Sequence, residues 1–151
     1  MATTYESLLP EILPMVPGCP DALGIQNIRS SVIELCEKAS VYQHELDPIS
    51  TVSSVYEYEF DAPLSTSVHK IVWGVYDGDA LEPVSSGMLE QRVPDWRNQT
   101  GTPEYIIKNN LTTLWIAPVP SASKTNGLIV RVALKPTYTS VSCDDTVMSD
   151  Y

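Results

Sequence analysis

The clearest strand signal lies in residues 68–84, which read VHKIVWGVYDGDALEPV. From Ile71 to Val75 large apolar side chains recur at every second position, which is the period of a β-strand. Asp77-Gly78 is a dipeptide typical of the two-residue turn of a β-hairpin. We therefore predict a strand up to this turn and a return strand over Ala80–Val84.

Further segments after Pro48 are rich in branched and aromatic residues and suit strands. These predicted strands are Val55–Phe60, Tyr105–Lys108, Thr113–Ala117 and Leu128–Leu134. Asn109-Asn110 separates two of them and predicts a second hairpin. Five or six strands joined as hairpins predict a mostly antiparallel sheet.

The first 49 residues are predicted to be helical. Prolines at positions 10, 14 and 17, together with Pro20, prevent a long helix before residue 20, because proline cannot donate a backbone hydrogen bond. Apolar residues then recur at spacings of three and four, which indicates an amphipathic helix over Pro20–Gln43. Its apolar stripe consists of Ile25, Ile28, Val32, Leu35 and Ala39. Ile33 and Cys36 broaden this stripe, so we expect the helix to pack on two neighbours, one of which could be another subunit.

Together these patterns predict an α+β fold, in which the N-terminal helical segment packs with a mostly antiparallel β-sheet of five to six strands. The helical head (1–49) and the β-rich body (50–151) are expected to form one compact unit without independent domains. A chain of 151 residues and 16.6 kDa has the size of one domain.

Residues 85–103 do not fit the sheet pattern. Gly87–Arg92 is expected to form a short helix, and Trp96 then follows in a polar loop beside Arg97. A tryptophan in such a loop either returns to cover the core or anchors a partner, since Trp and Arg are enriched at contacts. Of the two interpretations, we favour covering of the core.

The charge balance disfavours several classes of function. Asp and Glu number 19 against 9 Lys and Arg, giving a net charge of −10, so a basic nucleic-acid clamp is not expected. The apolar runs are much shorter than the ~20 residues of a membrane-spanning helix. The N-terminus lacks the features of a secretory signal, so synthesis in a cytoplasm is expected. Cys19, Cys36 and Cys143 are odd in number and widely spaced, which predicts a reducing interior without disulfides.

The sequence predicts no catalytic, cofactor or metal site. His44 and His69 lack the HExxH or CxxC context of a metal site, so surface or structural roles are expected. Glu57, Glu59 and Asp61 alternate along one predicted strand. Paired carboxylates can hydrolyse glycosides, but three like charges on one face are more typical of a solvated sheet face or a protected edge strand.

A resemblance is carried by residues along nearly the whole chain. In the head these are Leu9-Pro10, Val16–Pro20, Arg29, Glu34–Glu37, Tyr42-Gln43 and Leu46–Ile49. In the body they are YEYEF at 56–60, WGVYDG at 73–78, PDWR at 94–97, GTPEY at 101–105 and VALKP at 132–136. With these elements the chain resembles the head-to-tail connector, or adaptor, proteins of tailed bacteriophages, which are neck proteins that dock on the portal.

This resemblance implies a structural virion protein and not an enzyme. It implies a homo-oligomeric ring, a dodecamer, that docks on the phage portal protein, meets tail or nozzle proteins and extends the DNA channel used in genome ejection. DNA would pass without sequence-specific binding, and an acidic lumen suits that passage. A tail-terminator or collar role stays open. The proteins that the chain resembles continue past a Ser-Asp-Tyr stretch into another amphipathic helix, so either this member lacks that helix or the helix follows Tyr151.

Rings form through heterologous interfaces, in which one face of a subunit meets a different face of its neighbour. The expected subunit contacts are the helix stripe and the 85–103 loop. The candidate interface residues are Ile25, Ile28, Val32, Leu35, Trp96 and Arg97.

Two other classes of function stay open at this point. A carbohydrate-binding module would stack sugars on exposed Trp73, Trp96 and Trp115. A carboxylate-dependent glycoside hydrolase would use the acidic residues at 57, 59 and 61, with one carboxyl of raised pKa.

Overall fold

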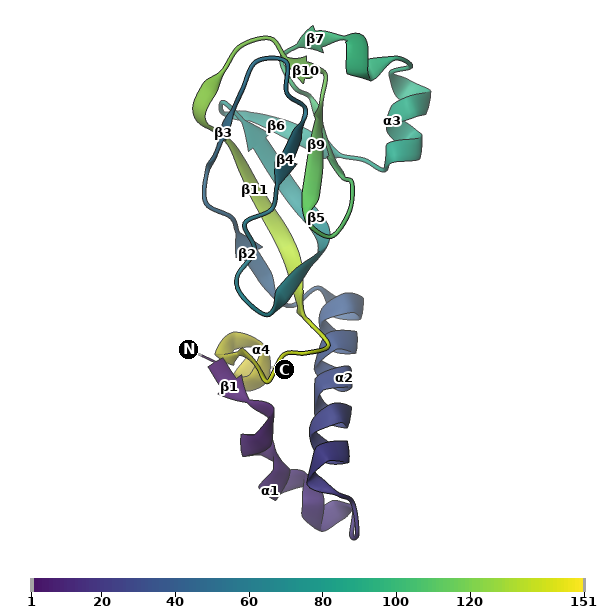
Figure 1. Cartoon of the computed structure of the whole chain (residues 1–151), viewed down its shortest axis with the longest axis vertical. Helices are drawn as coiled ribbons and strands as arrows, with labels where there is room; N and C mark the ends of the chain where they lie inside the picture. The colour runs from purple at the N-terminus through teal and green to yellow at the C-terminus, as the bar shows by residue number, and fades with distance from the viewer. Residues whose placement is uncertain (1, 151) are drawn as a thin grey trace. The chain divides into compact units, whose positions relative to one another are not determined.

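The computed structural model describes residues 2–150, so Tyr151 and any helix after it lie outside the described residues (Figure 1). The chain divides into two compact units. The helical unit comprises residues 2–42, 63–67 and 134–150, and the β unit comprises residues 43–62 and 68–133. The chain therefore crosses between the units several times, and segments far apart in sequence build each of them.

The β unit holds an eight-stranded curled sheet with the strand order β2-β11-β5-β6-β8-β9-β4, and β3 also pairs with β11. Its strands are β2 (Gln43–Glu45), β3 (Ile49–Thr51), β4 (Glu57–Glu59), β5 (Thr66–Tyr76), β6 (Asp79–Pro83), β8 (Tyr105–Lys108), β9 (Thr113–Ala117) and β11 (Lys124–Pro136). Both predicted hairpins are present, because β5 pairs antiparallel with β6 and β8 pairs antiparallel with β9.

Two parallel pairings were not expected from the sequence. Strand β6 pairs parallel with β8, with Glu82 opposite Tyr105, which makes the large sheet mixed. Two further strands, β7 (Thr100–Gly101) and β10 (Val119–Pro120), form a small parallel sheet of their own. Two parallel strands need a crossover segment between them, and residues 84–104 form the crossover from β6 to β8.

Part of that crossover is helical. Helix α3 (Ser86–Arg92) begins after Ser85, whose hydroxyl accepts a hydrogen bond from the backbone N–H of Met88 at 3.2 Å, a standard N-terminal cap. A 3₁₀ turn, η3 (Trp96–Asn98), follows. The expected short helix in this segment is therefore present.

The prediction of an α+β fold with five to six strands is wrong. The chain is mostly β, with 39% of its residues in strands, one eight-stranded mixed sheet and two smaller sheets. Several strands have only two or three residues and pair with distant segments. Such strands are too short to produce a period, so their formation depends on long-range pairing, which local pattern does not reveal.

The helical unit begins with β1 (Ala2–Thr4), the 3₁₀ turn η1 (Tyr5–Leu8), α1 (Leu9–Ile12) and the 3₁₀ turn η2 (Leu13–Met15). The long helix α2 (Asp21–Ala39) follows. The last elements of the chain are β12 (Ser142–Asp144), which pairs antiparallel with β1, and α4 (Asp145–Asp150).

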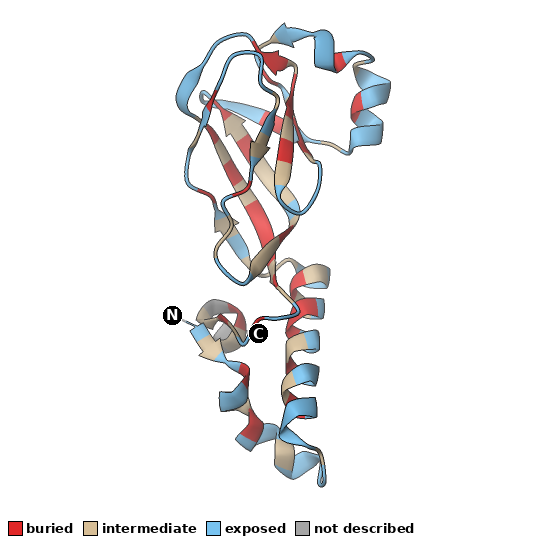
Figure 2. Ribbon diagram, in the orientation of Figure 1, coloured by how far each residue is buried: buried red, intermediate tan, exposed pale blue. Residues whose placement is uncertain are grey.

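Helix α2 is shorter than predicted. Pro20 occupies its N-cap, and Ser40 ends it with a left-handed φ of 50°, while its backbone N–H donates to the carbonyl of Cys36. Gln43, the predicted last residue, lies in β2 instead. The buried residues of α2 are Gly24, Ile28, Val32, Ile33 and Cys36, and they alternate with exposed positions along the helix (Figure 2).

Each unit has its own apolar cluster. In the helical unit the cluster includes Tyr5, Leu9, Ile28, Val32, Cys36, Cys143 and Val147. In the β unit Leu89, Trp96, Ile107 and Ala117 form a cluster in which α3 and η3 contribute side chains to the face of β8 and β9. Strand β11 also carries fully buried side chains: Leu128, Val130 and Val132 in the β unit, and Leu134 in the helical unit.

Candidate functional site: an apolar groove beside helix α2

An open groove lies in the helical unit, between α2 and the N-terminal turns. Its volume is about 370 Å³, and a second hollow of about 230 Å³ shares four of its lining residues. The groove is lined by Leu8, Ile12, Val16, Cys19, Gly24, Asn27, Ile28, Ser31, Val32 and Met148. None of these ten residues is Asp, Glu, Lys or Arg, although the chain as a whole carries a net charge of −10.

Proline spacing and one glycine build this groove. The prolines at positions 10, 14 and 17 keep the N-terminal segment in short turns, so it cannot form a second long helix that would cover α2. Gly24 then allows α1 to approach α2 closely, because a Cβ at this position would lie 2.8 Å from Cδ2 of Leu9. The groove therefore has one wall of α2 and one wall of short turns.

Apolar side chains at the groove and beside it remain in contact with solvent. The exposed fraction is 36% for Ile12, 43% for Val16 and 47% for Leu23. Met15, at the end of η2, is 82% exposed. A group of large apolar side chains around an uncharged hollow is the kind of surface that proteins use for contacts with other proteins.

Hydrogen bonds tie α2 to the C-terminal segment of the same unit. Arg29 donates from Nε to the carbonyl of Ser140 at 2.7 Å, and its guanidinium lies 5.9 Å from the ring centroid of Tyr5. The Tyr5 hydroxyl is 3.1 Å from Oγ of Ser140, and burial raises the pKa of this phenol. Lys135 pairs with Glu37 of α2 at 2.5 Å. These contacts fix α2 in position, so its groove wall is preformed.

Two of the interface residues predicted on α2 line the groove: Ile28 and Val32 are each only 8% exposed. Leu35 lines the adjoining smaller hollow, and Ile25 is half-buried against the same apolar cluster. The structure brings these four residues together on one helix. Ile28 and Val32 form the floor of the groove, while more exposed residues form its rim.

The rim residues were missed by the sequence analysis. Leu8, Ile12 and Val16 recur at intervals of four through the proline-rich segment. An interval of four is typical of one face of a helix, but a segment with this many prolines is not expected to form a long helix. Met148 comes from the opposite end of the chain, so only the tertiary structure brings it to the groove.

Trp96 and Arg97 belong to the β unit and do not line this groove. Trp96 is fully buried among Tyr56 and Trp115, with ring centroids at 5.1 and 5.5 Å. Its indole N–H donates to Glu90 at 3.2 Å. The Arg97 guanidinium lies 4.5 Å from the Trp96 ring centroid and pairs with Glu90 at 2.8 Å. These two hydrogen bonds lower the pKa of the Glu90 carboxyl.

This packing bears on the carbohydrate-binding alternative. Trp96 cannot stack on a sugar, because its ring is enclosed by protein. Trp115 packs in the same cluster, and Trp73 lies under the guanidinium of Arg131 at 5.6 Å. The three tryptophans therefore do not form an open aromatic platform.

The acidic residues that were weighed as hydrolase groups lie at the edge of the large sheet. Glu57 and Glu59 are exposed on β4, the edge strand beside β9, and Asp61 is exposed just after it. Within residues 2–150 no group of three or more His, Cys, Asp or Glu could hold a metal ion. His44 and His69 are half-buried in strands β2 and β5.

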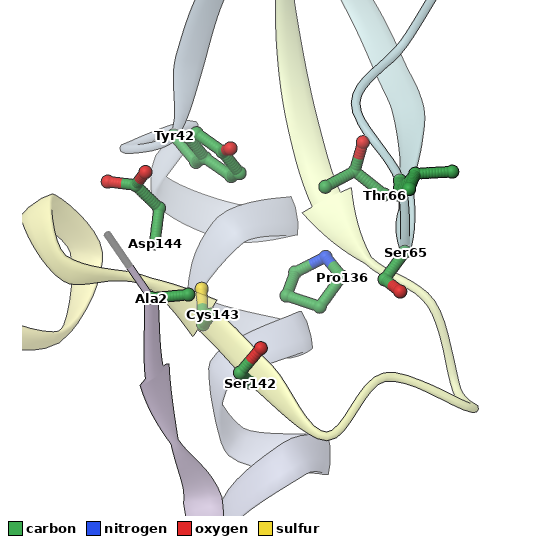
Figure 3. A pocket seen from close by; sticks show the side chains of 9 residues that line it. Ala2, Tyr42, Ser65, Thr66, Pro136, Ser142, Cys143 and Asp144 are labelled. Carbon is green, nitrogen blue, oxygen red and sulfur yellow. The ribbon is translucent and has the colours of Figure 1, made fainter.

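A smaller hollow of about 270 Å³ in the helical unit is more polar (Figure 3). Tyr42, Ser142, Cys143 and Asp144 are among its lining residues. Cys36 and Cys143, widely separated in sequence, belong to one buried cluster beside it, and all three cysteines are free. The sequence analysis missed this pair because spacing along the chain carries no information about the approach of β12 to α2.

Comparison with known proteins adds no family. No protein-family model matches the chain, and no curated protein matches it either. Across residues 2–150, the helices include none with the length and apolar character needed to cross a membrane. The assignment of function therefore depends on the groove and on the resemblance stated from the sequence.

Proposed function

We propose that this chain is a structural protein that assembles with copies of itself into a ring, as a head-to-tail adaptor in the neck of a tailed phage. The observation that carries this proposal is the apolar groove beside α2, which leaves side chains of the helical unit's own cluster open to solvent. Burial of such surface is the main driving force of subunit association.

The occupant of the groove is a second copy of the chain. Two molecules that each carry a net charge of −10 repel one another unless their contact avoids carboxylates. The ten described residues of the groove lining include no Asp, Glu, Lys or Arg, so a contact with them buries no unpaired charge. A self-contact at this uncharged surface is therefore the least costly one electrostatically.

Three exposed apolar side chains elsewhere on the helical unit supply the projection that would enter the groove. Leu64 is 96% exposed, and Tyr138 and Val141 are 73% and 68% exposed. Their loops are joined, because the backbone N–H of Thr137 donates to the carbonyl of Ser65 at 3.0 Å. A groove on one subunit and a projection on the next make a heterologous contact, which closes into a ring when the rotation permits.

The finer parts of the proposal follow from the resemblance and the charge. The ring docks on a portal protein, presents its other face to tail proteins and continues the DNA channel. A strongly acidic subunit supports this role, because a conduit for DNA must not hold phosphate groups. A dodecamer would match the symmetry that the resemblance implies.

The test is the molar mass of the purified full chain by light scattering, with electron-microscope images of the same sample. We expect a discrete ring for the natural chain. The double variant Ile12→Asp and Val16→Asp should remain monomeric with an unchanged circular dichroism spectrum, because both positions are open to solvent. The matched control is Leu111→Asp, which introduces a carboxylate at a 57% exposed position of the β unit and should leave the ring intact.

Mixing defective variants tests the heterologous contact directly. Leu64→Asp should also prevent rings, because it damages the projection and leaves the groove unchanged. When the two variants are mixed, the intact groove of Leu64→Asp can bind the intact projection of the groove variant. The mixture should therefore form dimers, which neither variant forms alone. A natural chain that stays monomeric over a wide range of concentration would refute ring assembly, and a mixture that stays monomeric would refute this pairing of surfaces.

A further inference from the structure

Two cysteines of the helical unit lie together in its apolar cluster. Cys36 belongs to the last turns of α2 and is fully buried, and Cys143 is the central residue of β12 and is 4% exposed. Both thiols are free. Strand β12 is held by its ladder with β1, in which Cys143 is paired with Thr3. Cys143 and Cys36 are both members of the buried apolar cluster of this unit.

The two sulfurs differ in their chemistry. The side chains of Cys36 and Cys143 interact directly, with the Cys36 thiol as hydrogen donor, and this hydrogen bond raises the pKa of Cys36 and lowers that of Cys143. Burial opposes ionisation of both. A backbone hydrogen bond at Asp144 further favours the Cys143 thiolate, whereas the carboxylates of Asp144 and Glu37 act against a thiolate at Cys143 and Cys36 respectively. Cys143 is therefore the better nucleophile of the two.

Access to solvent also distinguishes the two residues. Cys143 lines the hollow of about 270 Å³, together with Tyr42 and Asp144, whereas Cys36 is not among the lining residues. Figure 3 shows the Cys143 side chain at this hollow, next to Ser142 on the same strand. A small polar oxidant can enter a space of this size and reach the Cys143 sulfur. It would find Cys36 behind that sulfur and shielded by the apolar cluster.

We propose that Cys143 and Cys36 form an oxidisable pair, in which Cys143 meets a peroxide and Cys36 resolves the product as an intramolecular disulfide. In the first step the Cys143 sulfur attacks one oxygen of hydrogen peroxide, and the O–O bond breaks. Cys143 becomes a sulfenic acid, and the other peroxide oxygen is released as water. In the second step the Cys36 sulfur attacks the Cys143 sulfur, the S–O bond breaks and a second water leaves. The two thiols lose two electrons in total, and the peroxide gains them.

The disulfide would connect α2, one wall of the groove described above, to strand β12. Cys36 lies on α2, and β12 leads directly into α4, whose Met148 lines the groove. A bond between them restrains the unfolded chain over a long loop, so the oxidised protein should unfold at a higher denaturant concentration than the reduced one. The proposal itself is independent of ring assembly, because it concerns two thiols within one subunit.

The experiment uses the full chain with Cys19→Ser, which removes the third thiol, a half-exposed one that could otherwise link two molecules. The folded protein is treated with an equimolar amount of hydrogen peroxide, alkylated and analysed by intact mass and peptide mapping. We expect loss of two hydrogen atoms, no alkylation of either cysteine, and one peptide pair that joins Cys36 to Cys143. Recovery of both thiols in the alkylated form would overturn the proposal.

Two further variants test which thiol reacts first. With Cys36→Ser added, the sulfenic acid of Cys143 should persist and be trapped by dimedone. With Cys143→Ser added, Cys36 should remain reduced under the same conditions. Equal trapping at Cys36 would refute the assigned order. If a variant fails to fold, the order is read from the Cys19→Ser protein itself by brief peroxide treatment with dimedone present, where the label should appear at Cys143 only.

Discussion

The apolar clusters of the two units differ in how far their own chain covers them. In the β unit, α3 and η3 belong to the crossover between two parallel strands, and Trp96 from this crossover is fully buried in the cluster. In the helical unit, the N-terminal segment is broken by prolines into short turns and leaves the groove beside α2 open. One cluster is covered by its own chain, whereas the other presents apolar surface to solvent.

A low exposed fraction does not have the same meaning for all six predicted contact residues. Trp96 was weighed as a partner anchor, yet its side chain is used within its own unit. Ile28 and Val32 are almost as buried, but they form the floor of an open hollow. Low exposure therefore identifies core residues in both units, and the exposed rim indicates where a partner can bind.

The largest expected effect is that of Trp96→Ala. Removal of a fully buried tryptophan from the covered cluster should lower the free energy of unfolding by about 3–5 kcal/mol. Urea denaturation followed by circular dichroism measures this change. Leu111→Ala, at an exposed position of the same unit, is the control and should change stability by less than about 0.5 kcal/mol. A small effect of Trp96→Ala would mean that this cluster is not closed.

Two of the arginines beside aromatic rings, Arg29 and Arg97, should differ in their contribution to stability. Arg29→Met removes the donor to the carbonyl of Ser140, a residue only 1% exposed, and should cost about 1–3 kcal/mol of unfolding free energy. Arg97→Met removes a partly exposed ion pair with Glu90, which solvent screens, and should lower the free energy of unfolding by less than Arg29→Met does. Chemical denaturation of both variants tests the ranking, and equal costs would contradict it.

A pair of glycine variants compares the two helices. Gly24→Ala places a methyl group against Leu9, so it should destabilise the chain by about 1 kcal/mol despite the higher helix propensity of alanine. Gly87→Ala in α3 meets no atom within 4 Å and should stabilise by about 0.5 kcal/mol. Thermal and urea unfolding give both values. A stabilising Gly24→Ala would show that α1 does not pack closely on α2.

The smallest effect concerns pH and the Glu90 carboxyl. Its pKa is lowered in the folded chain by hydrogen bonds from Arg97 and Trp96, so its charged form favours folding at neutral pH. This contribution is lost as the pH falls through the lowered pKa. The natural chain should therefore have a higher denaturation midpoint than Glu90→Gln at pH 7, and the difference should vanish on acidification. Glu104→Gln, at an exposed position of the same unit, is the control and should show no such pH dependence.

The sequence predicted the local elements well where a few neighbouring residues decide the structure. The hairpin around Asp77-Gly78 forms as expected, since both residues adopt the positive φ that its turn requires, 49° and 88°. The second hairpin, β8 with β9, and the short helix α3 also form where they were predicted. The amphipathic stripe of α2 is real, although the helix ends at Ala39.

The turns, the two hairpins and the stripe of α2 could be predicted from the sequence, because each depends on residues that are neighbours along the chain. The acidic net charge follows from a simple count. Only the tertiary structure decided the mixed sheet, the groove beside α2 and the meeting of Cys36 with Cys143. Each of these joins segments far apart along the chain, and their pairing depends on the packing free energy of the whole unit and not on any local preference.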